Sequence, residues 1–168
     1  MVLARRGIRP DSQAKIGYEL GLTLPPEKGL KRLFPGARFS AKPLSYGYGT
    51  RVGNPKYSIN SYFRRHKLPF KETYLAPAKI HGLRETVSEN LSQGNDLMVC
   101  FNNKKLYGIG DWGHVCVIVG ITKSGIRLLD PDNKPYKITV KASRLMQAIR
   151  YHGKKNRGGL WIISKIKK

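Results

Sequence analysis

The sequence predicts an α+β fold, in which helices come first and an antiparallel sheet follows. Three observations indicate this class. Helix signals dominate the first part of the chain, apolar strand-like runs dominate the rest, and the turn-forming segment Thr122–Gly125 joins two of these runs as a hairpin. We expect one domain over residues 1–168, with a helical part of about 1–95 and a sheet part of about 96–168.

Start and stop signals define the expected elements of the helical part. Residues 2–7 are typical of the end of a helix closed by glycine, and Ser12 is expected to cap a helix that follows it. The elements expected in this part are helices at 13–20, 25–34 and 83–92, a long loop at 45–50 and a short strand at 70–75. A further helix is expected to be capped by Ser58, to carry Ile59, Tyr62 and Phe63 on one face, and to stop before Pro69.

Short apolar runs bounded by turn residues indicate the strands of the sheet part. The elements expected here are strands at 97–101, 114–121, 126–130, 136–140 and 160–164, a loop at 102–113 and a helix at 142–151. Because strands follow a helical first part, which is the α+β arrangement, we expect these strands to form an antiparallel sheet.

Charge is the strongest signal in the composition. The 168 residues contain 32 Lys and Arg against 10 Asp and Glu, a formal net charge of +22. Such a surface attracts polyanions, so nucleic acid is a possible partner, although no zinc-finger, ribonucleoprotein or helix-turn-helix signature is present. No apolar run approaches the roughly 20 residues that span a bilayer, and no export signal precedes the first helix, so we expect a cytoplasmic protein without a membrane span.

Only two cysteines, Cys100 and Cys116, occur in the chain, and each lies in an apolar run. They form neither a disulfide framework nor a zinc-ligand spacing, and the histidines show no metal-ligand spacing either. We therefore expect a reducing compartment, no metal and no cofactor.

A histidine and an aspartate on paired strands are the candidate catalytic residues. His114 opens one strand, and Asp130 ends the next strand just before a proline. Strand alternation places His114, Cys116 and Ile118 on one face. A base and an orienting carboxylate are two of the three groups of a nucleophilic hydrolase site, although a lone histidine at a strand start is more often structural. A simple hairpin would leave the two offset, so a bulge or a tighter turn is needed to join them.

This pattern resembles the histidine and aspartate motifs of papain-like cysteine peptidases, closest to the C39-like group that cleaves leader peptides after double glycine. The likeness covers nearly the whole chain in outline and includes the closing segment Gly158-Gly159-Leu160-Trp161. It implies a papain-like fold of the C39 type, a peptide or protein substrate, His114 as general base and Asp130 as the group that orients the imidazole.

The chain departs from that family in its nucleophile. The family places a cysteine at the start of an N-terminal helix, after a glutamine of the oxyanion hole, whereas residues 1–8 resemble only the end of that helix. The expected cysteine would lie upstream of Met1. Cys100 is expected in the core, and Cys116 has no helix N-terminus to lower its pKa.

Three functions follow from these observations. The chain is a cysteine peptidase domain that lacks its N-terminal nucleophile segment, an inactive relative that binds a peptide, or a basic structural or nucleic-acid-associated protein that uses the same fold. We expect the chain as given to be a poor peptidase, and His114→Ala to abolish any activity of a longer product with little effect on folding.

Overall fold

The computed structural model describes residues 1–24, 38–39, 49–132 and 134–166. These residues form two compact units, one made mainly of residues 1–69 and the other mainly of residues 70–168. The helix expected at 25–34 and most of the loop expected at 45–50 lie outside the described residues.

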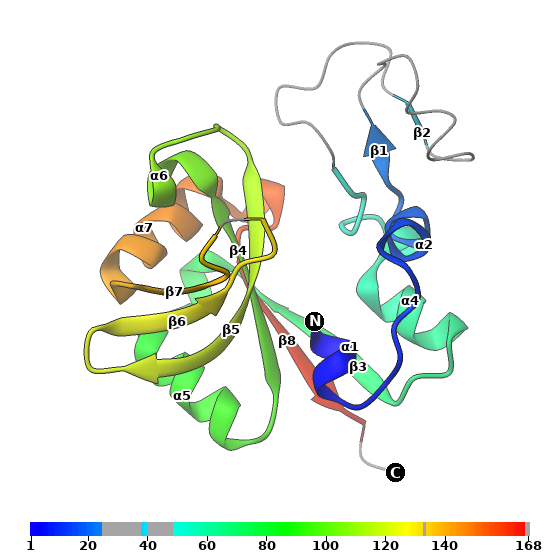
Figure 1. Ribbon diagram of the computed structural model, residues 1–168, viewed down its shortest axis with the longest axis horizontal. Helices are drawn as coiled ribbons and strands as arrows, with labels where there is room; N and C mark the ends of the chain where they lie inside the picture. Colours follow the sequence, from blue (N-terminus) through cyan, green and yellow to red (C-terminus); the bar gives the residue numbers. More distant parts are fainter. Residues whose placement is uncertain (25–37, 40–48, 133, 167–168) are drawn as a thin grey trace. The chain divides into compact units, whose positions relative to one another are not determined.

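Short elements make up the first unit (Figure 1). They are α1 (Val2–Arg5), α2 (Gln13–Glu19), β1 (Thr23–Leu24), β2 (Arg38–Phe39), the 3-10 turn η1 (Pro55–Tyr57) and α4 (Ile59–Arg65). Serine caps start two of the helices as the sequence predicts, since the side chains of Ser12 and Ser58 accept hydrogen bonds from backbone N–H groups in the first turns of α2 and α4. β1 and β2 pair in parallel.

The second unit contains a six-stranded sheet in its described residues, with the order β3-β8-β4-β5-β6-β7. Its strands are β3 (Phe70–Leu75), β4 (Asp96–Asn102), β5 (Gly113–Thr122), β6 (Gly125–Leu129), β7 (Lys137–Val140) and β8 (Gly159–Lys165). Every neighbouring pair is antiparallel. The six-stranded sheet therefore starts at β3 rather than at residue 96, because β3 pairs along its length with β8.

Helices cover this sheet on the face that carries the apolar core (Figure 1). They are α5 (Leu83–Ser92), α6 (Asn103–Tyr107) and α7 (Ala142–His152), accompanied by the 3-10 turns η2 (Pro77–Lys79) and η3 (Lys154–Asn156). Both α5 and α7 pack against the central strand β4. The core joins Val87 of α5, Leu145 and Ile149 of α7, and Phe101 and Ile118 of the sheet.

The arrangement of helices and an antiparallel sheet confirms the predicted α+β class. One helix was not expected: α6 forms inside the segment 102–113, which the sequence suggests is a loop. Among the described residues, no helix has the length and apolar character needed to cross a membrane.

Candidate functional site

His114 lies on the helix-covered face of β5, near the start of the strand. Its Cα pairs with that of Phe101 on β4, and its ring is 6 % exposed. The predicted alternation is confirmed, because Cys116 and Ile118 belong to the same apolar core, two and four residues further along β5. The rings of Phe101 and Tyr107 meet the His114 ring edge-on, at centroid distances of 5.5 and 6.1 Å.

Asp130 reaches His114 because the hairpin between β5 and β6 contains a register shift. The pairs Ile121–Ile126 and Gly120–Arg127 follow one register, and Ile118–Leu128 follows another, so a bulge lies between Ile118 and Gly120. Of the two possibilities expected from the sequence, a bulge or a tighter turn, the structure contains the bulge. It brings Asp130 Oδ1 to 2.8 Å from His114 Nε2, and Asp130 is 1 % exposed.

The hydrogen bond to Asp130 also selects the tautomer of His114. An ionised carboxylate accepts hydrogen bonds and donates none, so Nε2 must carry the proton. In the neutral ring, Nδ1 then holds the lone pair that can accept a proton. The nearest carboxylate to that nitrogen belongs to the exposed Asp132, whose Oδ2 lies 3.6 Å from Nδ1.

Two further groups hold the Asp130 carboxylate. The Tyr107 hydroxyl donates to Oδ2 at 2.7 Å, and the backbone N–H of Asp132 donates to Oδ1 at 2.9 Å. Burial raises the pKa of Tyr107, and its hydrogen bond to Asp130 raises it further, so the phenol keeps its proton and remains a donor. Both oxygens of the carboxylate are thus fixed in position.

Tyr107 is the site residue that the sequence analysis missed. It ends α6, inside the segment interpreted as a loop. A weak signal was available: the Asn102 side chain caps the helix by accepting from the Lys105 N–H, and Gly108 ends it in the left-handed conformation. Asparagine followed by glycine six residues later marks a single helical turn, which is too short for periodicity to detect.

The glycine before His114 admits a neighbouring helix. A Cβ on Gly113 would lie 2.5 Å from Nε2 of His152, at the end of α7. The His152 ring therefore packs directly on the backbone that carries His114. Burial lowers the pKa of His152, so the ring favours its neutral form at this position.

Neither cysteine has the environment of a nucleophile. Burial raises the pKa of the Cys100 thiol to about 12. Cys116 lies in the site, but burial and the neighbouring Asp130 charge both raise its pKa. Because the reactive species is the thiolate, these two thiols are poor nucleophiles at neutral pH.

The side chains of His114, Cys116 and Asp130 offer ligand atoms within 4.8 Å of one another, the spacing of a possible metal site. The bonding favours a hydrogen-bond network instead. Both Asp130 oxygens already accept hydrogen bonds, from His114 and Asp132 N–H on one side and Tyr107 on the other. A metal ion would have to displace these donors and deprotonate a buried thiol.

Comparison with known proteins identifies the fold. A solved structure from Bacillus anthracis, described as a C39-like peptidase, superimposes with a TM-score of 0.58 over 99 % of this chain and 85 % of its own, at 17 % identity. The fold is of the papain-like, C39 type. No family model matches the sequence, and no curated protein matches it. At this identity the likeness establishes the arrangement of elements, and the role of each side chain must be argued from the site itself.

Proposed function

We propose that this domain carries the base and orienting group of a cysteine peptidase-type site and that its substrate is a peptide or protein. The observation that carries the proposal is the buried contact between His114 Nε2 and Asp130 Oδ1, which leaves Nδ1 as the basic nitrogen. The shared fold with a C39-like peptidase supports the same assignment.

In this proposal His114 takes the proton of a thiol and later returns it to the leaving amine. Asp130 holds the ring in the correct tautomer and stabilises the imidazolium that forms. Tyr107 is a positioning residue, because it touches Asp130 and fixes the carboxylate rather than the substrate. The pair is buried in a water-poor setting, which strengthens its electrostatic contact.

The thiol itself must come from outside the pair of cysteines described above, since Cys100 and Cys116 are both held in the thiol form. We propose that a longer product supplies it from a segment before Met1, as in the peptidases that the chain resembles. The alternative within the same fold is a relative that binds a peptide beside His114 without cutting it.

Alkylation by iodoacetamide, followed by mass spectrometry, tests the assignment. In the folded 168-residue chain we expect both cysteines to resist labelling at pH 7. In a product extended upstream through the natural reading frame, we expect one additional cysteine to react quickly and the extended product to cleave peptides. His114→Ala should slow the labelling of that cysteine. It should also lower the rate of peptide cleavage by about two to four orders of magnitude.

An extended product whose cleavage survives His114→Ala would disprove the catalytic role. If the extension contains no cysteine, the peptide-binding alternative takes its place. It predicts that peptides perturb the NMR signals of His114 in the wild-type chain and bind more weakly to the His114→Ala variant. An absence of both cleavage and peptide binding would reject both forms of the proposal.

A second candidate rests on a separate observation, the net charge of +22. It is a basic structural or nucleic-acid-associated protein that uses the same fold. Titration with random-sequence DNA and RNA over a range of salt concentrations tests it, because binding through phosphate contacts weakens steeply as salt rises. A lack of binding at low salt would remove this candidate.

A further inference from the structure

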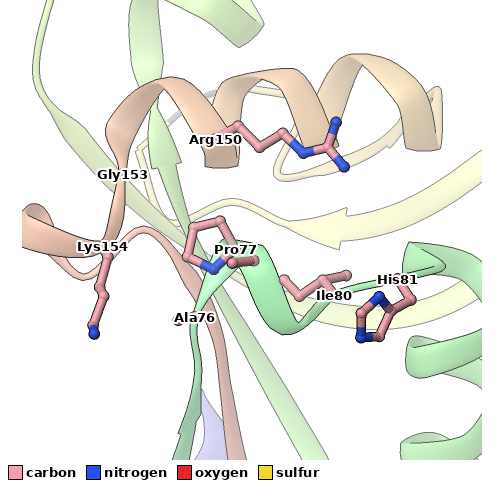
Figure 2. Close-up of a pocket in the computed structure, with 8 residues that line it drawn as sticks. Ala76, Pro77, Ile80, His81, Arg150, Gly153 and Lys154 are labelled. Atoms are coloured by element: carbon pink, nitrogen blue, oxygen red, sulfur yellow. The ribbon is translucent and has the colours of Figure 1, made fainter.

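A cavity of about 510 Å³ lies in the second unit, and its lining includes none of the residues that hold Asp130. One side is the end of α7 and the residues after it, represented by Arg150, Gly153 and Lys154. The other side is the segment around η2, which supplies Pro77, Ile80 and His81 among others (Figure 2). The two sides pack against each other within the same unit.

The cavity combines an apolar wall with cationic groups. Ala76, Pro77, Ala78 and Ile80 form the apolar wall, and Figure 2 shows the Arg150 side chain lying across the space from Pro77, Ile80 and His81. Lys154 lies at the opposite end from His81 in the same view. No acidic side chain is among the lining residues.

Arg150, Lys154 and His81 have no carboxylate partner within the part of the chain that the structure describes. The ion pairs formed there involve other residues, and neither Arg150 nor His81 donates a hydrogen bond to a carboxylate in that part. By contrast, the guanidinium groups of Arg65 and Arg157 each bind a glutamate. Arg150 and His81 are both exposed to solvent, so their donors are open to a group from outside the chain.

The helix dipole alone does not account for this arrangement. Basic side chains in the last turn of a helix offset its negative end, and Arg150 lies in the last turn of α7. That role does not require His81 or an apolar wall, which come from a different segment. It also predicts no anion binding, so the two explanations differ in what they predict.

We propose that this cavity binds a small organic anion, a phosphate or carboxylate attached to an apolar body. Arg150 and His81 would donate hydrogen bonds to the anionic group, and the apolar body would lie against Pro77 and Ile80. The volume falls in the range typical of small-molecule sites, roughly 300–1,000 Å³. The inference does not depend on the proposed peptidase role, because neither His114 nor Asp130 lines the cavity.

Isothermal titration calorimetry of the 168-residue chain at physiological salt tests the proposal, with 1-naphthyl phosphate and 1-naphthoate as probes. We expect at least one of them to bind roughly tenfold more tightly than either 1-naphthol or inorganic phosphate. Only these two probes combine an anionic group with an apolar body, and both parts contribute to binding. The preferred probe distinguishes a phosphate ligand from a carboxylate ligand.

Variants separate a built site from general attraction by a basic protein. Arg150→Ala and His81→Ala should each weaken binding, the former by about tenfold. Arg144→Ala is the matched control, because Arg144 is an exposed arginine of the same helix that does not line the cavity. Its affinity should stay within about twofold of wild type.

Circular dichroism confirms that each variant is folded before titration. Equal weakening by Arg144→Ala and Arg150→Ala would overturn the proposal, because it would show nonspecific attraction. Equal affinity for the organic anions and inorganic phosphate, equal affinity for 1-naphthol, or no binding by the wild-type chain would overturn it as well.

Discussion

Two histidine–carboxylate pairs in this protein have the same contact distance and opposite surroundings. His114 and Asp130 in the second unit, like His66 and Glu19 in the first, place Nε2 2.8 Å from a carboxylate oxygen. The side chains of His114 and Asp130 are 6 % and 0 % exposed, and those of His66 and Glu19 are 26 % and 21 % exposed. Distance alone therefore does not distinguish a candidate catalytic pair from a surface ion pair.

The two pairs differ in the groups that surround each carboxylate. Glu19 also binds the cationic Arg65, and Asp11 near His66 is paired with Lys15, so this cluster balances its charges locally. Asp130 instead receives neutral donors, the Tyr107 hydroxyl and a backbone N–H, and the nearest additional charge at His114 is a second carboxylate, Asp132. Neutral donors orient a carboxylate and leave its charge available to a protonated imidazole.

The largest expected difference between the two pairs is in stability. Asp130→Ala leaves His114 and Tyr107 buried without their acceptor, and we expect a loss of about 3–5 kcal/mol. Glu19→Ala should cost about 1 kcal/mol or less, because solvent screens that pair. Urea unfolding measures both. Tryptophan fluorescence reports the second unit, where Trp112 and Trp161 lie, and circular dichroism reports the whole chain.

If Asp130→Ala and Glu19→Ala lowered the free energy of unfolding equally, burial would not distinguish the two pairs. His114→Ala is a useful companion, since Asp130 keeps two donors in that variant. It should cost less than Asp130→Ala.

Replacement of Tyr107 tests how much its hydrogen bond to Asp130 contributes to the buried pair. Tyr107→Phe keeps the ring against Phe101 but removes the hydrogen bond that Tyr107 donates to Asp130 Oδ2. We expect a loss of about 1–3 kcal/mol by urea unfolding. In an active extended product, kcat should fall while KM stays near its wild-type value, because Tyr107 positions the carboxylate and does not touch the substrate. An unchanged kcat would assign Tyr107 a purely structural role.

Gly113→Ala tests how closely the backbone beside His114 is packed. The new methyl group would meet the His152 ring, and we expect a loss of about 1–3 kcal/mol from this overpacking. In the double variant with His152→Ala, most of that loss should be recovered. A double-mutant cycle by urea unfolding measures the coupling between the two positions, and additive losses would show that His152 is not the obstacle.

The smallest expected effect is the pH response of the exposed pair. Burial opposes ionisation of Glu19, but hydrogen bonds from His66 and Arg65 outweigh it and hold its pKa below the usual 4.5. A lowered carboxyl pKa adds stability that is fully present above the unfolded value and is lost as pH falls through the folded one. Wild type should therefore lose more stability than Glu19→Gln as pH falls from 5 to 3. Parallel losses, measured by denaturation monitored by circular dichroism, would contradict this.

Strand periodicity predicts which face of β5 carries His114. The need to connect His114 with Asp130 predicts a bulge or a tighter turn, and the structure has the bulge. Both follow from local geometry. Tyr107 could not be found in the same way, because the short helix α6 is held by tertiary contacts rather than by its own periodicity. The His66–Glu19 contact could not be predicted from the sequence for a related reason, since it joins residues 47 positions apart that share no strand or helix.

The tautomer of His114 tests the central claim most directly. Long-range ¹H–¹⁵N NMR of the folded chain, at a pH where the ring is neutral, identifies which ring nitrogen carries the proton. Our account predicts a proton on Nε2, donated to Asp130, and an unprotonated Nδ1 available as a base. A neutral ring with its proton on Nδ1 would contradict it, because the nitrogen assigned to accept a proton would already be occupied.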